Sequence, residues 1–276
     1  MTYRPNTKVG VYVDVANMYF NGGRRMQYDA LREFACRDGA DPLRLNAYVS
    51  FDVERAQEDI IYRDGINKFH AKLQDFGYKV IRKEVKWYQD DDKRYRKANA
   101  DLDLAVDVLL QSKNLDRILI ATGDGDFVRV VRALQNLGCR VEIVAMDNVS
   151  SDLRHEADMF MSGYLIPNLI PIDYHPDNMA WGDVGSRVRG VCYRHGDRGY
   201  GFMRYLKKID AGLWLTDTRR SSSPYGSVYF HDSSLLTRNF NFSSSTSQSY
   251  VFEFDLVESN RTEELEAVNI KPISKL

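Results

Sequence analysis

Short apolar segments alternate with longer amphipathic segments from residue 9 to about residue 165 of this 276-residue chain. The short segments are rich in β-branched and aromatic residues, which favours strands, and the segments between them have helical periodicity. The strand candidates are residues 9–15, 45–51, 78–85, 117–122 and 140–146, and the helix candidates are residues 28–37, 54–76, 100–112, 126–137 and 150–157. This alternation predicts right-handed βαβ units and an α/β fold whose parallel sheet is covered on both faces.

The pattern changes after residue 165. Residues 166–185 hold three of the chain's seven prolines and break both periodicities, so we expect a linker or a strap lying on the first domain. Short strand candidates with turns rich in Gly and Ser follow, which predicts a small β-barrel. They are residues 187–194, 200–206, 212–217, 226–231, 250–259 and 266–273. The expected domains are therefore residues 1–165 and 186–276, joined by the linker 166–185.

The composition is that of an ordinary globular protein, with 43% hydrophobic and 28% charged residues. No apolar run reaches the ~18 residues of a membrane span, and the first residues lack the apolar stretch of a signal peptide. The three cysteines, Cys36, Cys139 and Cys192, are widely spaced and form no CxxC pair, which predicts reduced thiols. We expect a cytoplasmic protein that has no membrane partner. Its oligomeric state does not follow from the sequence.

Acidic residues lie where two strand candidates end. Asp14 closes the apolar part of the first strand, and Asp124 and Asp126 follow the fourth. Ligands of parallel α/β sheets bind outside the carboxyl ends of the strands. If the first and fourth strands are neighbours, these acids converge with Asp101, which begins a helix candidate. Four crowded carboxylates repel one another unless a cation is bound, and an all-oxygen ligand set suits Mg²⁺ or Mn²⁺.

Each of these acids also has a purely structural interpretation as a turn residue or a helix cap. Asp126, for example, fits the N-cap or the first turn of the helix that follows it. Asp103 and Asp107 are expected on a solvated helix face, and Asp147 is expected to be a turn acid.

Four segments resemble the NYN domain of the PIN-like nuclease superfamily, in the order of that family and over roughly residues 8–165. They are VGVYVDVANMYF, KANADLDLAVDVLL, ILIATGDGDFVRVVRALQNLGCRVEIVA and SSDLRHEADMFM. The resemblance implies a PIN-like α/β/α sandwich that binds Mg²⁺ or Mn²⁺, and characterised members cut RNA endonucleolytically. It assigns catalysis to five residues, of which the four acids are also the metal ligands: Asp14, Asn17, Asp101, Asp124 and Asp126.

Such a site would lower the pKa of a metal-bound water and stabilise the charge that develops on a phosphodiester. Asp126, at the rim, is our choice for the group that accepts the proton of the attacking water. Lys97 matches the lysine that precedes the helix acid in the family, and it would neutralise a phosphate oxygen.

Residues 79–101 interleave cations with aromatic residues and lead directly into Asp101. Cations bind phosphates while aromatic rings stack on bases, so this segment is expected to bind single-stranded RNA. The residues predicted to contact the nucleic acid are Trp87, Arg94, Arg96 and Lys97. The alternative is a solvated hairpin whose acids, in QDDD, offset its own positive charge.

Two motifs in the second domain, DRGYGFMRY at 197–205 and GSVYFHDSSL at 226–235, resemble the ribonucleoprotein motifs of a cold-shock domain. That family is an OB-fold barrel that stacks single-stranded bases on aromatic rings. The resemblance covers roughly residues 186–272. It assigns base stacking to Tyr200, Phe202, Tyr229 and His231.

The second domain departs from the cold-shock pattern at two positions. The Trp usual in the first strand is missing, and either Tyr193 or His195 replaces it. Asp232 stands where an aromatic residue is usual. Because side chains alternate along a strand, Phe202 is expected to point outward if Met203 points into the core.

The sequence thus predicts a metal-dependent endoribonuclease with a second, RNA-binding domain. One alternative is a non-catalytic RNA-binding regulator that keeps an acidic metal pocket. Another is a hydrolase of small phosphate esters, which the second domain argues against. No Gly-rich phosphate loop with its lysine, no GxSxG and no CxxC motif occurs, which leaves the chemistry of those motifs without support.

Overall fold

The structure of the protein is a computed structural model that describes residues 6–90, 93–97, 100–173, 179–237, 240, 242, 249–259 and 265–275. Of residues 86–90 and 93–97 it describes the backbone alone. The chain divides into two compact units. Residues 1–24 and 31–161 form the first unit, and residues 25–30 and 162–276 form the second.

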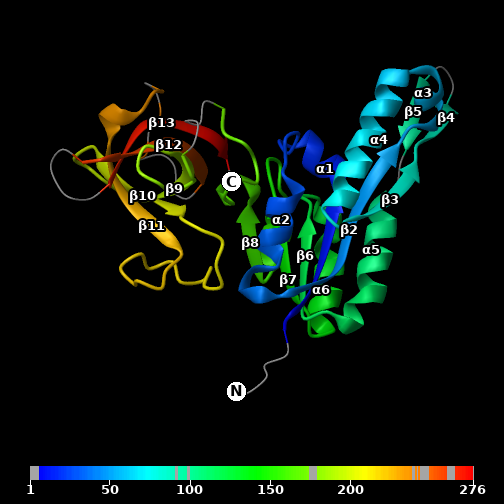
Figure 1. Cartoon of the computed structure of the whole chain (residues 1–276), viewed down its shortest axis with the longest axis horizontal. Helices are drawn as coiled ribbons and strands as arrows, with labels where there is room; N and C mark the ends of the chain where they lie inside the picture. The colour runs from blue at the N-terminus through cyan, green and yellow to red at the C-terminus, as the bar shows by residue number, and fades with distance from the viewer. Residues whose placement is uncertain are drawn as a thin grey trace. The chain divides into compact units, whose positions relative to one another are not determined.

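The first unit is built on a sheet of six strands. They are β1 Lys8–Asp14, β2 Asp41–Phe51, β3 Lys79–Glu84, β6 Arg117–Ala121, β7 Arg140–Ala145 and β8 Met159–Ser162. Their order in the sheet is β3-β2-β1-β6-β7-β8 (Figure 1). The pairs β1–β2, β2–β3, β1–β6 and β6–β7 are all parallel, which confirms the predicted α/β fold and the adjacency of the first and fourth strand candidates.

Helices connect these strands. They are α1 Val15–Phe20, α2 Tyr28–Ala35, α3 Val53–Glu58, α4 Ile60–Asp75, α5 Ala100–Gln111, α6 Val128–Asn136 and α7 Ser151–Glu156, with the 3₁₀ turns η1 Arg37–Gly39, η2 Ser112–Asn114, η3 Gly125–Phe127 and η4 Gly163–Leu165. The helix expected over residues 54–76 is interrupted, because the Asp59 carboxylate caps α4 by accepting the Tyr62 N–H at 2.9 Å. The helix α1, with 6 residues, is too short for its periodicity to show in the sequence.

Side chains of alternate strand residues cover the two faces of this sheet. Tyr12 of β1 and Ile143 of β7 lie in one buried cluster with residues of α5 and α6, among them Leu104. Glu142 points to the opposite face, where its buried carboxylate accepts a hydrogen bond from Arg37, just beyond α2, at 2.5 Å. Helices therefore lie on both faces of the sheet, as in an α/β/α sandwich.

Two further strands, β4 Lys86–Asp90 and β5 Lys93–Lys97, pair antiparallel in a sheet of their own. They form part of the segment that was expected to bind RNA. The contacts predicted for the side chains of Trp87, Arg94, Arg96 and Lys97 lie outside the described residues.

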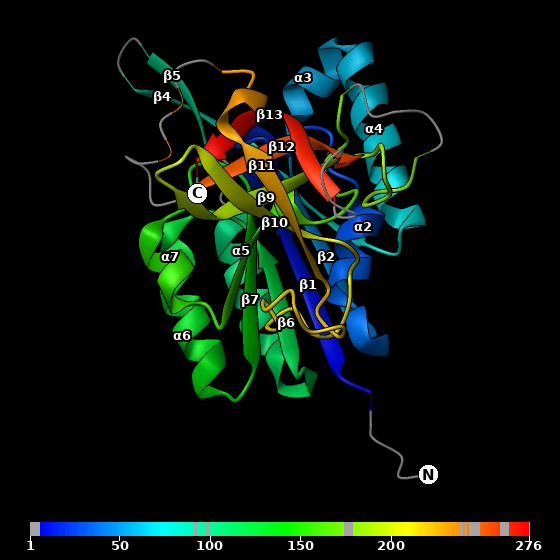
Figure 2. The same cartoon turned by 90° about the vertical axis from the view of Figure 1, so that its left-hand side faces the viewer.

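The second unit contains a closed barrel of five strands. They are β9 Arg187–Gly196, β10 Tyr200–Leu206, β11 Tyr225–His231, β12 Tyr250–Glu258 and β13 Leu265–Lys275, with the 3₁₀ turn η5 Asp232–Ser234 after β11. The barrel closes in the order β10-β11-β13-β12-β9 (Figure 2). Five strands closed in this way are consistent with the OB-like barrel that the sequence predicted.

A buried ion pair ties the barrel to the segment that precedes it. The guanidinium of Arg189 donates to the Glu253 carboxylate at 3.0 Å, to the carbonyl oxygen of Ile170 at 2.8 Å and to that of Pro171 at 3.3 Å. Because a buried guanidinium needs acceptors for its N–H groups, this arrangement fixes the segment on the barrel of its own unit.

One expected strand is wrong. Residues 212–217 form turns, in which the Leu213 N–H bonds to the carbonyl of Ala211 at 3.0 Å and the Leu215 N–H to that of Gly212 at 2.8 Å. These N–H groups are therefore not available for hydrogen bonds to a neighbouring strand. Trp214, in the same turns, is 72% exposed.

The three cysteines are free, with Cys36 partly exposed and Cys139 and Cys192 buried. Among the described residues, no helix combines the length and the apolar character that a membrane crossing needs.

The interior of the barrel sets a steric limit at Gly201, where a Cβ atom would lie 2.6 Å from both the Arg194 carbonyl oxygen and the Phe230 ring. We predict that Gly201→Ala lowers the free energy of unfolding by about 1–3 kcal/mol, because the backbone and a core ring must both move. Gly196→Ala is the control, since its Cβ would meet nothing closer than 3.8 Å. Calorimetric unfolding of the two variants measures the difference, and equal stability would contradict this packing.

Candidate functional site

The acidic site begins where β1 and β6 leave the sheet side by side. Val13 of β1 pairs with Ala121 of β6, so the next residues, Asp14 and Thr122, emerge at the same edge. Both are buried, with Asp14 only 4% exposed. The Thr122 hydroxyl donates to Asp14 Oδ2 at 3.4 Å. The parallel pairing of two central strands thus creates the buried end of the site.

The turn after β6 is held by side chains of the site itself. Asn17 Oδ1 accepts the Gly123 N–H at 2.9 Å, and Thr122 Oγ1 accepts the Asp124 N–H at 3.3 Å. Asp124 Oδ1 in turn accepts the Asp126 N–H at 2.9 Å. Successive backbone N–H groups of the turn are therefore satisfied locally, which fixes its conformation. Asn17 acts on this turn through its amide oxygen.

Two of the acids are helix caps as well as members of the site. Asp14 caps α1 by accepting the Asn17 N–H at 3.0 Å, and Asp124 caps η3. The capping interpretation of the sequence therefore holds for both. A cap uses one oxygen of a carboxylate, however, and does not prevent the other from facing a cation. Asp126 is exposed in the first turn of η3.

The carboxylates are close enough to change each other's protonation. The pKa of Asp14 is raised from 3.8 to about 6, first by burial and then by the charges of Asp101 and Asp124, against the opposing hydrogen bonds from Asn17 and Thr122. The pKa of Asp101 is also raised, first by burial and then by the charges of Asp124 and Asp126. The structure thus brings the four predicted acids within electrostatic range.

This donor set suits a divalent metal ion in its chemistry, because oxygen ligands with excess negative charge are those that Mg²⁺ and Mn²⁺ prefer. In the part of the chain that the structure describes, no group of three or more His, Cys, Asp or Glu side chains is arranged to hold a metal ion. The acids are therefore neighbours whose oxygens do not already surround one point. The caps direct one oxygen of Asp14 and one of Asp124 to backbone N–H groups instead.

Two other acids of α5 are bound in the framework. The Asp103 carboxylate accepts the Lys83 ammonium of β3 at 2.8 Å, and Asp107 accepts the hydroxyl of buried Tyr48 at 2.8 Å. Both side chains keep part of the exposure that the sequence suggested for them, and each also has a partner on the sheet. These two contacts fix α5 to the strands β3 and β2.

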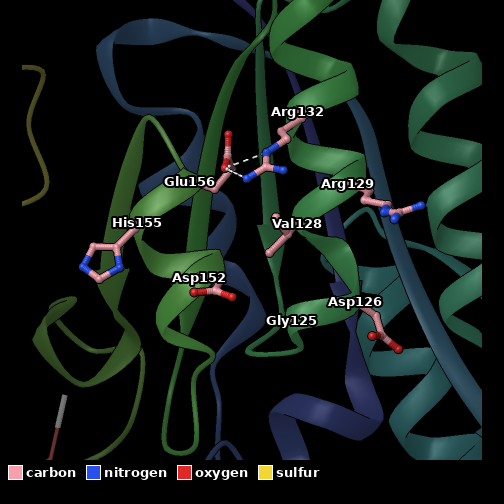
Figure 3. Close-up of a pocket in the computed structure, with 8 residues that line it drawn as sticks. All are labelled: Gly125, Asp126, Val128, Arg129, Arg132, Asp152, His155 and Glu156. Carbon is pink, nitrogen blue, oxygen red and sulfur yellow. Dashed lines mark hydrogen bonds and ion pairs between the residues drawn. The ribbon is translucent and has the colours of Figure 1, made fainter.

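An open hollow of about 500 Å³ lies beside the acidic site, between α6 and α7. Figure 3 shows Asp126 at one side of it and the ion pair of Arg132 with Glu156, at 2.8 Å, at another. Its lining is Gly125, Asp126, Val128, Arg129, Arg132, Asp152, His155 and Glu156. Asp126 is therefore the member of the acidic site that borders this hollow. Its lining includes none of the other three acids.

Thr122 is the residue of this site that sequence reasoning missed. Its hydroxyl contacts both Asp14 and the backbone of Asp124. The signal was present in IATGDGDF, where Thr122 directly precedes the two acids, but a threonine at the end of a strand has no motif of its own.

In the barrel, aromatic side chains alternate across β10 and β11 as the sequence indicated. Met203 and Phe230 are fully buried, whereas Tyr200, Phe202 and Tyr229 retain exposure on the outer surface. Tyr200 lies opposite His231, which is also exposed, and Phe202 lies opposite Tyr229. The four residues assigned to base stacking thus share one outer face.

The residue that replaces the missing Trp is Tyr193. Its ring centroid lies 6.3 Å from that of Phe202 on the outer face. His195 instead stacks on Phe242 at 4.7 Å between centroids, and its Nε2 lies 2.8 Å from the Asp232 carboxylate. Asp232, the second departure from the cold-shock pattern, therefore holds His195 in the barrel wall.

Four rings form a continuous row on this face, which we call the barrel ladder. Its neighbouring centroids are 6.1 Å apart for Tyr200–Tyr229, 6.1 Å for Tyr229–Phe202 and 6.3 Å for Phe202–Tyr193. Arg204 extends the row, since its guanidinium carbon lies 5.7 Å from the Tyr193 centroid. Rings beside a cation are the combination that binds single-stranded nucleic acid.

Comparison with known proteins identifies the first unit. Residues 8–168 match the NYN domain, so the chain belongs to the NYN domain family, a family of PIN-like nucleases. The chain is 25% identical over 169 residues to the low amplitude and bright protein LabA of Synechococcus elongatus, a match that covers 58% of this chain and 86% of that protein. A crystal structure of a protein of unknown function from Vibrio parahaemolyticus is similar at 23% identity and a TM-score of 0.47, covering 59% of this chain and 96% of the other.

The raised pKa of Asp14 predicts a pH-dependent stability. Its pKa of about 6 in the folded protein exceeds the ordinary value of 3.8, so ionisation of this carboxyl group opposes folding. This cost is absent below pH 3.8, grows between the two values and is complete above pH 6. In chelator, Asp14→Asn, which keeps an oxygen for the α1 cap, should stabilise the protein at pH 7.5 by on the order of 1–3 kcal/mol.

The advantage should shrink towards zero at pH 4, as urea unfolding at the two pH values would measure. Asp152→Asn, at an exposed position on α7, is the control and should show no such trend. A stabilisation by Asp14→Asn that is equal at both pH values would show that the charge of this carboxylate is not its source.

Proposed function

We propose that this protein is a metal-dependent endoribonuclease that hydrolyses phosphodiester bonds in single-stranded or structured RNA. The observation that supports it most is the cluster of Asp14, Asp101 and Asp124 at the carboxyl edge of the sheet, where burial and then mutual repulsion raise the pKa of Asp14 and Asp101. Retaining such repulsion in a fold is costly, and a bound cation would relieve it. Membership of a nuclease family supports the same conclusion.

The four acids Asp14, Asp101, Asp124 and Asp126 would hold Mg²⁺ or Mn²⁺. The ion would supply a water of lowered pKa and would stabilise the negative charge of the phosphodiester in the transition state. Asn17 keeps the turn at Gly123 in place, and Thr122 does the same at Asp124. Asp126, exposed at the rim, accepts the proton of the attacking water.

RNA binding is shared by two surfaces in this proposal. Trp87, Arg94, Arg96 and Lys97 of the basic hairpin bind the strand that enters the acidic site. The barrel ladder, with His231, stacks on unpaired bases and adds affinity for single strands. We place the activity in the cytoplasm, because the three cysteines are free thiols.

A non-catalytic RNA-binding regulator is the second candidate. One observation favours it: no three acidic, His or Cys side chains of the described residues are arranged for a metal ion. In that case the acidic site would be a remnant or a ligand pocket, and the RNA-binding surfaces would carry the function.

Cleavage of labelled single-stranded RNA tests the first proposal. With Mg²⁺ or Mn²⁺ we expect internal cuts that disappear in chelator and in Asp124→Asn, because that change removes a charged ligand and keeps the side-chain volume. Asp152→Asn, on the neighbouring α7, should cut normally. Binding of RNA without cleavage under both metals would favour the regulator. A protein that neither binds nor cuts RNA would contradict both candidates.

The barrel ladder makes a separate prediction. Tyr200→Ala with Phe202→Ala should weaken binding of single-stranded RNA about tenfold or more, since each stacked base contributes about 1–3 kcal/mol. Fluorescence anisotropy measures the affinity, and manganese binding should be unchanged. Trp214→Ala, which removes a still more exposed ring outside the ladder, is the control. An unaltered affinity of the double variant would rule out stacking on this face.

A further inference from the structure

Two adjacent aromatic side chains are exposed at the end of α1. Tyr19 is 45% exposed and Phe20 is 66% exposed, and their rings meet edge to face with centroids 5.4 Å apart. The helix explains their position, because it buries Val15 and Met18 on the side towards the sheet. We call these two residues the α1 aromatic pair. Neither the acidic site nor the barrel ladder uses it.

A cation accompanies the pair. The Arg24 guanidinium carbon lies 5.4 Å from the Tyr19 ring centroid. The chain reverses to bring it there, since the Gly23 N–H bonds to the Met18 carbonyl at 2.8 Å and a Cβ on Gly23 would lie 2.6 Å from that oxygen. Among the described residues, Arg24 is exposed and has no carboxylate partner. Its charge therefore remains available to an anion.

The pair is held firmly next to the acidic site. The Asp14 carboxylate caps the first turn of α1, and Asn21 at the other end accepts the Asp147 N–H at 2.8 Å and the Asn148 amide at 3.0 Å. Both ends of the helix are thus fixed to the loops at the carboxyl edge of the sheet, where α1 lies in Figure 1. At a rise of ~1.5 Å per residue, Phe20 is about 9 Å along the helix from Asp14.

We propose that Tyr19, Phe20 and Arg24 form a base-stacking site, which holds a nucleobase next to the phosphate that is cut while Arg24 binds a neighbouring phosphate. This inference rests on the proposed nuclease function and adds to it a residue set that positions single-stranded substrate. The three side chains suit single-stranded RNA, because the face of any base can stack on an aromatic ring. The positive charge of Arg24, which lies over the Tyr19 ring, attracts a phosphate of the RNA backbone. A duplex, whose bases are paired and stacked, would not engage the pair.

Binding of single-stranded RNA that carries 2-aminopurine tests this proposal in the full chain. The parent protein is the Asp124→Asn variant in chelator, so that no cleavage interferes. Tyr19→Leu with Phe20→Leu keeps apolar bulk and removes the rings, so we expect about tenfold weaker binding and loss of the stacking quench of 2-aminopurine. Tyr19→Phe with Phe20→Trp keeps the rings and should retain both signals.

Two controls make the result specific to the pair. Ile61→Ala removes an 86% exposed apolar side chain of α4 in the same unit and should change neither signal. Photo-crosslinking of RNA that contains 4-thiouridine should label α1 in the parent protein and lose that label in the leucine variant. Phe20→Leu alone, at the more exposed ring, should give an intermediate affinity.

The outcomes separate this inference from the function on which it rests. If the wild-type protein cuts RNA and the leucine variant keeps its affinity, quench and crosslink, the stacking site is wrong and the nuclease stands. If the wild-type protein neither binds nor cuts RNA, both are wrong. Unchanged RNA binding by the leucine variant together with loss of a bound protein would assign the pair to protein docking and overturn the stacking site.

Discussion

The parallel pairing of β1 with β6 is the interaction on which the acidic site depends. Their apolar residues lie fully buried in the centre of the sheet, and the register of Val13 with Ala121 brings the next residues out together. Asp14 and the turn that begins at Thr122 therefore face each other across one strand spacing. The hydrogen bonds from the Gly123 N–H to the Asn17 amide oxygen and from the Thr122 hydroxyl to Asp14 follow from that placement. The core and the acidic site thus depend on the same pairing of strands, and a shift of this register would separate the acids.

The same carboxylates serve the fold and the chemistry. Asp14 starts α1 and Asp124 starts η3, so neither helical turn would begin in the same way without them. Burial and the neighbouring carboxylate charges raise the pKa of Asp14 and Asp101, so the ionisation of both opposes folding at neutral pH. A cation bound among these carboxylates would relieve that cost. Caps on the carboxylates also explain why several acids lie close together without forming a ready ligand cage.

Period-2 and helical alternation in the sequence accounted for most of the fold. It located five strands of the first sheet and five strands of the barrel. It failed where elements are short or satisfied locally: α1 and β8 have 6 and 4 residues, and residues 212–217 bond within their own turns. It also left open whether Tyr193 or His195 replaces the missing Trp. A β-bulge beside Phe202 and the contact of His195 with Asp232 decide this, and neither is visible in local pattern.

The sequence by itself determined the family, the α/β fold with its following barrel, and the identity of the acids, because each depends on residue types at short spacing. Only the tertiary structure decided which acids meet. Asp103 is taken by Lys83 and Asp107 by Tyr48, while Asp101 of the same helix reaches Asp14. The physical reason is that burial and electrostatic repulsion depend on distances between segments far apart in the chain, and those distances exist only once the sheet has formed.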